Sequence, residues 1–262
     1  MATILDEIAE ATKERVAESK KCIDNAQMRK MAEEMDANTG FPFYKALAAE
    51  GMSFICECKK ASPSKGIIAE DFPYLEIAKD YEAAGASCIS VLTEPKWFLG
   101  SNQYLKEITS TVGIPCIRKD FTVDEYMIYE AKTLGASAVL LICSILSKEQ
   151  LKEYLDVAHS LGLSAIVETH DDAEMEMAID AKAGIVGVNN RNLKDFTVDV
   201  NNSKRLREMA PKDMIFVAES GIKTREDVAV LEESLVDAVL VGETLMKAED
   251  KKAMLDYLKG IK

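Results

Sequence analysis

The arrangement of apolar residues along the chain predicts its secondary structure. From residue 54 onward, short apolar runs alternate with longer segments in which apolar residues recur at helical spacing. This alternation is typical of parallel strands joined by crossover helices. The apolar runs predict eight strands, at Phe54–Cys58, Cys88–Leu92, Cys116–Arg118, Ala138–Ile142, Ser164–Glu168, Gly184–Val188, Ile215–Ala218 and Ala238–Val241.

The segments between these runs predict helices, and several of them end in a glycine. Gly85, Gly135 and Gly162 each come shortly before a predicted strand. Glycine adopts the left-handed conformation that ends a helix at little steric cost. We expect helices at Leu75–Ala84, Asp124–Leu134, Lys148–Leu161, Asp171–Ala181, Asn202–Met209 and Arg225–Glu232.

Eight strand–helix units in roughly 200 residues favour a closed barrel over an open doubly wound sheet. No G-x-G-x-x-G sequence follows a predicted strand, which removes the main argument for a dinucleotide-binding fold. The segment before the first strand looks helical, with a further helix starting at Pro42, and no Pro/Gly-rich linker follows it. We therefore expect an α/β protein with one structural domain: a single (β/α)8 TIM barrel, residues 51–262, on which an N-terminal helical extension, residues 1–50, is packed.

Composition and charge exclude several classes of partner. The chain carries 32 Lys and Arg against 45 Asp and Glu, a net charge of −13, whereas nucleic-acid binding depends on neutralising phosphates. No apolar run reaches the roughly 18 to 20 residues that span a bilayer, and the first residues lack the basic flank and apolar block of a signal peptide. We expect a cytoplasmic protein without nucleic-acid or membrane partners. Any phosphorylated ligand must then be bound by a few well-placed Lys and Arg residues.

The six cysteines and two histidines do not form a metal-binding pattern. Cys56 and Cys58 have neither a second pair nor a nearby histidine to complete a zinc site. Most of the cysteines lie in apolar runs, so we expect them to be reduced core residues. With only His159 and His170 available, histidine-based triads are poorly supported. We expect neither a metal nor a cofactor.

Charged and amide side chains recur at the carboxyl ends of the predicted strands, where the active sites of such barrels lie. Successive strand residues alternate between the barrel interior and the surrounding helices. Glu57 and Lys59 share a face with Ile55, and this face should point inward because charges are excluded from the apolar helix layer. The same alternation directs six polar side chains into one space: Glu57, Lys59, Lys119, Glu168, Asn189 and Glu219.

Such a cluster suits acid–base chemistry, because carboxylates and ammonium groups shift one another's pKa values. A lysine that is partly desolvated, or near other cations, is expected to donate a proton near neutral pH. Backbone N–H groups at Ser220–Gly221 and Gly242–Glu243, after the last two predicted strands, are candidates for binding a phosphate. The Glu243 carboxylate must turn away from such an anion, and it would favour the N-terminus of the last helix.

Seven segments together resemble indole-3-glycerol phosphate synthase, and they follow one another through nearly the whole predicted barrel. The combination of the first, third and fifth is specific, whereas the last two recur among other phosphate-binding barrels. The segments are ECKKASPSKG (57–66), VLTEPKWFLGS (91–101), IRKDF (117–121), IVETHD (166–171), GVNNRNL (187–193), AESGI (218–222) and VGETLM (241–246).

The resemblance implies a decarboxylating lyase of tryptophan biosynthesis. Its substrate would be 1-(2-carboxyphenylamino)-1-deoxyribulose 5-phosphate, which is closed to indole-3-glycerol phosphate with release of carbon dioxide and water. Lys119 then looks like the general acid for the ketone oxygen, and Glu168 and Glu57 are candidate bases. Lys59 is a phosphate contact or a second acid, and their division of labour stays open. Asn189 and Glu219 are interpreted as positioning groups.

Further contacts follow from the same resemblance. Arg191 and the loop containing Ser62 would approach the substrate carboxylate, Phe98 would pack on the anthranilate ring, and Ser220 would contact substrate. Trp97 is interpreted as a loop packing residue. The phosphate would lie near Lys59, Gly221, Gly242 and Glu243. Association with other enzymes of tryptophan biosynthesis stays open.

Two other functions compete with the synthase. A phosphate-binding barrel similar to phosphoribosylanthranilate isomerase would share the phosphate end, but it would not require Glu57, Lys59, Lys119 and Glu168 together. A non-catalytic barrel subunit would be expected to lack at least one charged residue of the cluster, and none is missing.

Overall fold

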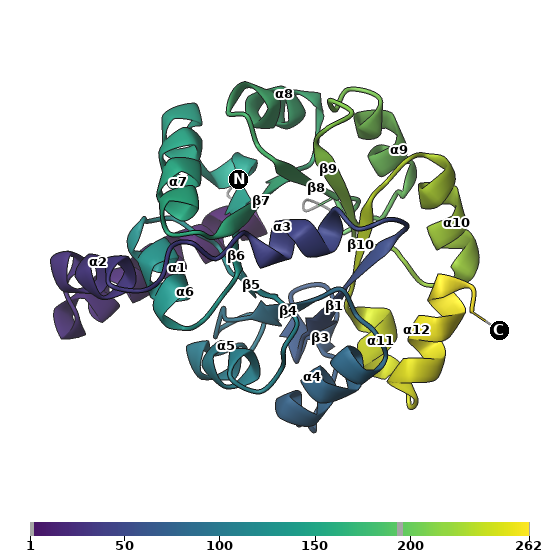
Figure 1. Cartoon of the computed structure of the whole chain (residues 1–262), viewed down its shortest axis with the longest axis horizontal. Helices are drawn as coiled ribbons and strands as arrows, with labels where there is room; N and C mark the ends of the chain where they lie inside the picture. The colour runs from purple at the N-terminus through teal and green to yellow at the C-terminus, as the bar shows by residue number, and fades with distance from the viewer. Residues whose placement is uncertain (1–2, 193–195, 262) are drawn as a thin grey trace.

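Eight parallel strands close into a barrel, as the sequence predicts (Figure 1). The computed structural model describes residues 3–192 and 196–261, so residues 1–2 and 262 of the expected ranges, and Leu193 of the fifth segment, lie outside the described residues. The strand order around the barrel is β1-β10-β9-β8-β7-β6-β5-β4. The strands are β1 (Ser53–Cys58), β4 (Cys88–Leu92), β5 (Cys116–Lys119), β6 (Ala138–Ile142), β7 (Ser164–Thr169), β8 (Ile185–Asn189), β9 (Ile215–Glu219) and β10 (Ala238–Val241).

Helices cover the outside of the barrel between successive strands (Figure 1). The six predicted helices correspond to α4 (Tyr74–Ala83), α6 (Tyr126–Thr133), α7 (Lys148–Ser160), α8 (Asp172–Asp180), α9 (Asn201–Arg207) and α10 (Arg225–Glu233). The pattern did not single out α5 (Asn102–Thr109), α11 (Glu243–Lys247) and α12 (Lys251–Lys259).

Two apolar cores explain why the strands read as continuous apolar runs. One fills the barrel interior and includes Ile55, Ile117 and Leu240. The other lies between the strands and the helices and includes Cys56 and Cys58, the outward positions that strand alternation assigned to them. Strands buried on both faces have no polar face to show. Each fully buried aliphatic side chain contributes about 1.5–3 kcal/mol relative to exposure.

The cysteines are free thiols, and all but one belong to these cores. Cys22 alone is exposed among the six. Burial raises the pKa of the Cys56 thiol to about 12, so it stays protonated and unreactive. Among the described residues, no helix is both long enough and apolar enough to cross a membrane.

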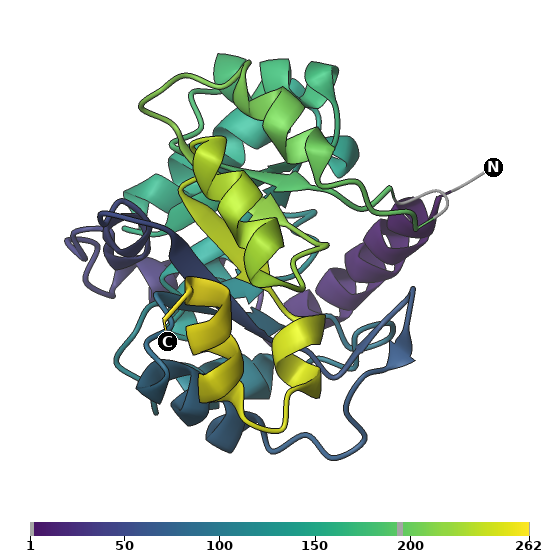
Figure 2. The ribbon, with the colours of Figure 1, turned by 90° about the vertical axis from the view of Figure 1, so that its right-hand side faces the viewer.

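Three N-terminal helices, α1 (Ile4–Cys22), α2 (Asn25–Glu33) and α3 (Pro42–Leu47), precede β1. Figure 2 shows α1 and α3 at opposite ends of the barrel. Phe43 and Leu47 of α3 belong to the interior core, and the backbone N–H of Tyr44 donates to Ser164 Oγ (3.3 Å) at the start of β7. Helix α3 therefore covers the amino ends of the strands.

Helix α1 is fixed at the carboxyl ends of the strands by Arg15. Its guanidinium lies 2.7 Å from Asp120 Oδ1 and donates to the carbonyl oxygen of Thr93 (3.2 Å). The Asp120 side chain is fully buried and also accepts a hydrogen bond from the Thr93 hydroxyl (2.5 Å). Burial opposes ionisation of Asp120, but Arg15 and Arg118 outweigh it and lower the pKa of this carboxyl.

Arg15→Met should lower the free energy of unfolding by about 1–3 kcal/mol near neutral pH, because it removes one of two cations from a buried carboxylate. A carboxyl whose pKa is depressed by folding stabilises the protein above its unfolded pKa, and this stability is lost as the pH falls. The difference in unfolding free energy between Arg15→Met and the parent should therefore shrink below about pH 3.8, the ordinary pKa of an Asp side chain. Urea unfolding at several pH values measures both effects. Lys13→Met, which removes an exposed ion pair of the same helix, is the control, and equal stability of the two variants would contradict the assignment.

Candidate active site

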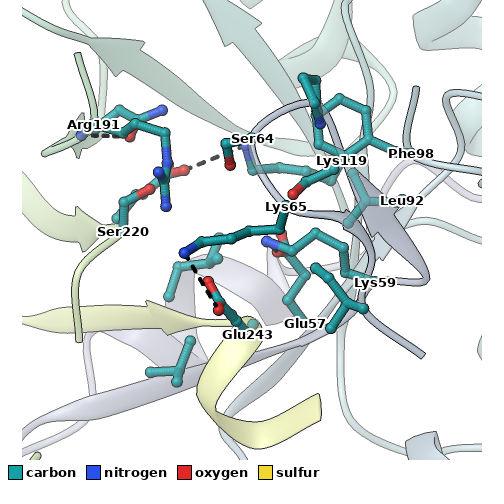
Figure 3. A pocket seen from close by; sticks show the side chains of 18 of the residues that line it. Glu57, Lys59, Ser64, Lys65, Leu92, Phe98, Lys119, Arg191, Ser220 and Glu243 are labelled. Atoms are coloured by element: carbon teal, nitrogen blue, oxygen red, sulfur yellow. Dashed lines mark hydrogen bonds and ion pairs between the residues drawn. The ribbon is translucent and has the colours of Figure 1, made fainter. Parts of the chain in front are cut away.

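A cavity of about 590 Å³ opens at the carboxyl ends of the strands. Ile4, Leu5 and Ile8 of α1 contribute to its wall, so the N-terminal helix is part of the pocket. Figure 3 shows charged side chains converging in it from several strands. The cavity is lined by every predicted site residue: Glu57, Lys59, Ser62, Phe98, Lys119, Glu168, Asn189, Arg191, Glu219, Ser220, Gly221, Gly242 and Glu243.

The centre of the cavity is an ammonium group between two carboxylates. Lys119 Nζ, at the end of β5, lies 3.1 Å from Glu168 Oε2 and 3.3 Å from Glu219 Oε2. Glu168 Oε1 also accepts a hydrogen bond from Asn189 Nδ2 (3.2 Å). The side chains of both glutamates are only 3% exposed, and that of Lys119 is 14% exposed. Three neighbouring strand ends, β7, β8 and β9, therefore hold one lysine in a fixed position.

From the sequence, we expect a lysine that donates its proton near neutral pH. The surroundings of Lys119 instead raise its pKa. Burial disfavours the ammonium, but Glu168, Glu219 and Glu57 outweigh it and raise the pKa of Lys119 above its ordinary value. Burial likewise opposes ionisation of Glu168, yet Lys119 and His170 lower its pKa. The pKa of Glu219 is raised, first by burial and then by the neighbouring carboxylates. Lys119 is therefore protonated, and Glu168 ionised, across the neutral range.

A second ion pair lies on β1 and just beyond its end. Lys59 Nζ is 2.5 Å from Glu57 Oε1, and Glu57 Oε2 accepts a hydrogen bond from the Ser90 hydroxyl (3.2 Å). The Glu57 side chain is 3% exposed and that of Lys59 is 19% exposed. The carboxylate is thus fixed below the ammonium, which faces the open part of the cavity.

Two glycines make the close approach of these side chains feasible. A Cβ at Gly187 of β8 would overlap Glu219 Oε1 and lie 2.7 Å from Ile166 Cγ2. A Cβ at Gly242 would lie 2.5 Å from Glu57 Oε1 and 2.9 Å from Lys59 Nζ. A side chain at either position would therefore push these charged groups away from where they lie, although neither glycine has a positive φ.

The loops after β9 and β10 form the wall beside Lys59. Ser220 and Gly221 both have positive φ, 68° and 89°, which turns the chain sharply after β9. The Glu243 carboxylate contacts two lysines: Oε1 accepts from Lys247 Nζ (2.6 Å) and lies 3.9 Å from Lys65 Nζ (Figure 3). Glu243 is also the first residue of α11, so its negative charge lies in the first turn of that helix, where the sequence predicts it.

The loop after β4 presents Phe98 to the cavity. Its ring packs at 5.9 Å, centroid to centroid, from that of Phe121. A buried carboxylate shapes this loop: Glu94 accepts hydrogen bonds from the backbone N–H groups of Lys96 (2.9 Å), Trp97 (2.7 Å) and Phe98 (3.0 Å). The Trp97 side chain packs against the interior core, as expected of a packing residue.

Sequence reasoning did not identify two polar residues that support the site, Glu94 and His170. The alternation of side chains holds only within a strand. It therefore says nothing about Glu94, which lies beyond the end of β4 and folds back on its own loop. His170 follows β7, and its Nε2 lies 3.3 Å from Glu168 Oε1. The signal was present in IVETHD, where the histidine is two positions beyond an inward-facing carboxylate.

Arg191 lies on the rim and its backbone is fixed by the end of β8. Its N–H donates to Asn189 Oδ1 (3.1 Å), and its guanidinium Nη1 donates to the carbonyl oxygen of Phe196 (3.2 Å). Ser62 belongs to β2 (Ala61–Ser62), which pairs with β3 (Gly66–Ile67) in a short hairpin at the cavity mouth. Among the described residues, no group of three His, Cys, Asp or Glu side chains is arranged to bind a metal ion.

Known proteins resemble this chain over almost its whole length. The family model for indole-3-glycerol phosphate synthase matches residues 5–258. A protein of that name from Ruminiclostridium cellulolyticum is 55% identical over 257 residues, covering 98% of this chain and 99% of the relative. Another from Leuconostoc mesenteroides is 50% identical and covers 99% of this chain and 100% of the relative.

Solved structures of lower identity share the fold. The 3-hexulose-6-phosphate synthase of Salmonella typhimurium has a TM-score of 0.66 at 14% identity and covers 80% of this chain and 98% of its own. A tryptophan synthase α-subunit from Pyrococcus furiosus has a TM-score of 0.60 at 16% identity, with coverage of 79% and 98%. Because the family model matches residues 5–258 and the two relatives are 55% and 50% identical, the chain belongs to the indole-3-glycerol phosphate synthase family.

Proposed function

We propose that this chain closes the indole ring of 1-(2-carboxyphenylamino)-1-deoxyribulose 5-phosphate, with Lys119 as the general acid. The family is that of a carboxy-lyase in tryptophan biosynthesis. The observation that carries the assignment of Lys119 is its position: one buried, protonated ammonium held between Glu168 and Glu219 in the cavity. An acid placed in this way meets a carbonyl oxygen without first having to be desolvated or oriented.

In the first stage, the ring carbon that bears the carboxylate forms a bond to the ketone carbon of the substrate. The carbonyl π electrons move to oxygen, which takes the Lys119 proton and becomes a hydroxyl group. The ring carbon then loses carbon dioxide, and the released electron pair restores aromaticity. Because Lys119 is charged and fixed, it stabilises the negative charge that develops on the oxygen.

In the second stage, the new hydroxyl leaves as water and a neighbouring carbon loses a proton. Glu168 is the base in this scheme because it contacts Lys119 directly. Once Lys119 has given up its proton, one of the two positive charges that lower the Glu168 pKa is gone, and the carboxylate becomes a stronger base. Lys59, bonded to Glu57 on the other side of the cavity, is then the acid for the leaving hydroxyl, and Glu57 positions it.

The phosphate is assigned to the wall formed by the loops after β9 and β10. Gly221 and Gly242 line the cavity there, and Lys59, Lys65 and Lys247 lie on the same side. Three lysines together provide local positive charge in a chain whose net charge is −13. Glu243, paired with two of them, contributes its backbone and not its carboxylate.

The remaining contacts complete the binding of the substrate. Phe98 packs on the anthranilate ring of the substrate. Arg191, Ser62 and Ser220 bind the substrate's carboxylate and the hydroxyl groups of its sugar-derived part. Asn189 and Glu219 orient Glu168 and Lys119, to which they are bonded. An isomerase would not need the second ion pair, and the relatives reported above carry the name of the synthase.

The helices before β1 and the barrel are proposed to form one structural domain. The Arg15–Asp120 ion pair and the burial of Phe43 and Leu47 in the barrel interior support this. A cytoplasmic location and an association with other enzymes of tryptophan biosynthesis stay predictions.

Lys119→Met should reduce the turnover number by about 10²–10⁴-fold, because the ketone oxygen loses its proton donor. Indole fluorescence of the product measures the rate, with no metal or nucleotide added to the purified protein. Lys148→Met, which removes an exposed lysine from α7, is the control, and circular dichroism confirms the fold of both variants. Turnover of Lys119→Met within a few-fold of the parent would remove the acid role, and no product with the parent would refute the synthase activity.

A dephosphorylated substrate analogue should bind at least about 100-fold more weakly than its phosphorylated counterpart. Hydrogen bonds to charged groups contribute about 1.5–3 kcal/mol each, and several would be lost together. Competitive inhibition constants of the two analogues give the ratio. Lys65→Met should weaken the phosphorylated analogue alone; equal affinity of both analogues for the parent protein would contradict this phosphate site.

A further inference from the structure

His170, just beyond the end of β7, is used by none of the steps above, yet it touches the base. Its Nε2 lies 3.3 Å from Glu168 Oε1, and its Nδ1 lies 2.9 Å from Glu174 Oε2. We propose that His170, clamped by Glu174, is a positioning residue that directs Glu168 toward Lys119 and holds it as a carboxylate. The inference rests on the proposed role of Glu168 and extends it to a residue that does not touch substrate.

The clamp fixes the imidazole ring from the side of α8. Glu174 Oε2 accepts hydrogen bonds from both the backbone N–H (2.8 Å) and the ring Nδ1 of His170. Glu174 is itself fixed, because its N–H donates to Asp171 Oδ1 (3.0 Å) at the N-cap of α8. Asn202 Nδ2 of α9 donates to the carbonyl oxygen of His170 (3.0 Å). The ring therefore has little freedom to rotate away from Glu168.

The environment of both ring nitrogens favours the doubly protonated imidazolium. An ionised carboxylate only accepts hydrogen bonds, so a nitrogen facing one must carry its proton. Nδ1 faces Glu174, while Nε2 is buried, faces Glu168 and has no well-aligned hydrogen-bond partner. Burial opposes the charge, but the two carboxylates outweigh it and raise the pKa of His170 to about 10.

Polar groups of β5, β8 and η1 contact Glu168 or Glu174, the two partners of His170, and Glu219 of β9 shares Lys119 with Glu168. Lys119 of β5 bonds the far oxygen of Glu168, and Asn189 of β8 donates to the near one. Cys143, in the 3-10 helix η1 (Cys143–Ile145), donates its thiol to the Glu174 carbonyl oxygen (3.6 Å). Burial and the carboxylates raise the pKa of this thiol, so it adds no charge.

Glu168 thus lies between two cations, and they have different tasks. Lys119 gives up its proton in the first stage, whereas His170 keeps its own. Before that stage, the positive charges of Lys119 and His170 lower the pKa of Glu168, so the proton stays on Lys119. Afterwards His170 is the cation that remains beside Glu168, and it keeps the carboxylate oriented while its basicity rises.

A simple structural role predicts a loss of stability without a change in the pH dependence of the reaction. If His170 instead positions Glu168, its removal should change the pH dependence of kcat. Removing the imidazolium raises the Glu168 pKa, and activity that needs ionised Glu168 is lost as the pH falls. The acidic limb of kcat should therefore move to higher pH.

The test compares His170→Ala and His170→Gln with His159→Gln, which replaces the only other histidine, an exposed residue of α7. We expect His170→Ala to lose about tenfold or more in kcat, with the acidic limb shifted upward by about one pH unit, which corresponds to a tenfold change in an equilibrium. KM should stay within a factor of about three, since the residue does not touch substrate. His170→Gln should recover part of kcat through its amide N–H but should keep the shifted limb.

Glu174→Gln tests the clamp, with Glu176→Gln on the exposed face of α8 as its matched control. In the His170→Ala background, Glu174→Gln should have no further effect on kcat. If the acidic limb of His170→Ala coincides with that of the parent, or if Glu174→Gln is fully additive with it, the proposal is overturned.

Nitrogen NMR of the two histidines tests the inference without any turnover. We expect His170 to stay doubly protonated through the neutral range in the parent and to titrate at lower pH in Glu174→Gln, while His159 is the same in both. Titration of His170 at or below its ordinary value of 6.5 in the parent overturns the proposal. A parent protein that makes no product refutes the proposed function separately, because the NMR result does not depend on activity.

Discussion

The site depends on keeping the Lys119 ammonium charged at the carboxyl end of a barrel whose core is apolar. Isolated charges are costly to bury, and here the cost is offset by pairing Lys119 with Glu168 and Glu219 from neighbouring strand ends. The pairing needs space as well as charge, which is why β8 carries Gly187 where any side chain would displace Glu219. In its proposed role, Lys119 is a general acid that is protonated and oriented before substrate binds.

The two ends of the barrel have different tasks. At the amino ends, α3 supplies apolar side chains that close the interior core. At the carboxyl ends, α1 is fixed through Arg15 and adds apolar wall to the cavity. The loops after β9 and β10 are the third feature, because Lys59, Lys65 and Lys247 concentrate positive charge on this side of the cavity in an acidic protein.

The fold could be predicted from sequence because strand and helix periods are local. The inward direction of Glu57, Lys119 and Glu219 followed from the same alternation, since a charge has no stable place in the helix layer. The direction of the Lys119 pKa shift did not follow, because it depends on how many carboxylates surround the ammonium in space. Glu94 escaped because it lies in a loop, where no period fixes the direction of a side chain. His170 lies just beyond the end of β7, and the alternation of that strand was not continued to it.

The account depends most on Lys119 being protonated in the resting protein. Nitrogen NMR of its side-chain amine, assigned by comparison with Lys119→Met, measures this directly. The account predicts that the group remains an ammonium beyond pH 10.5, the ordinary value for lysine. Titration of this amine near neutral pH would contradict it, because the lysine would then be largely neutral when substrate binds.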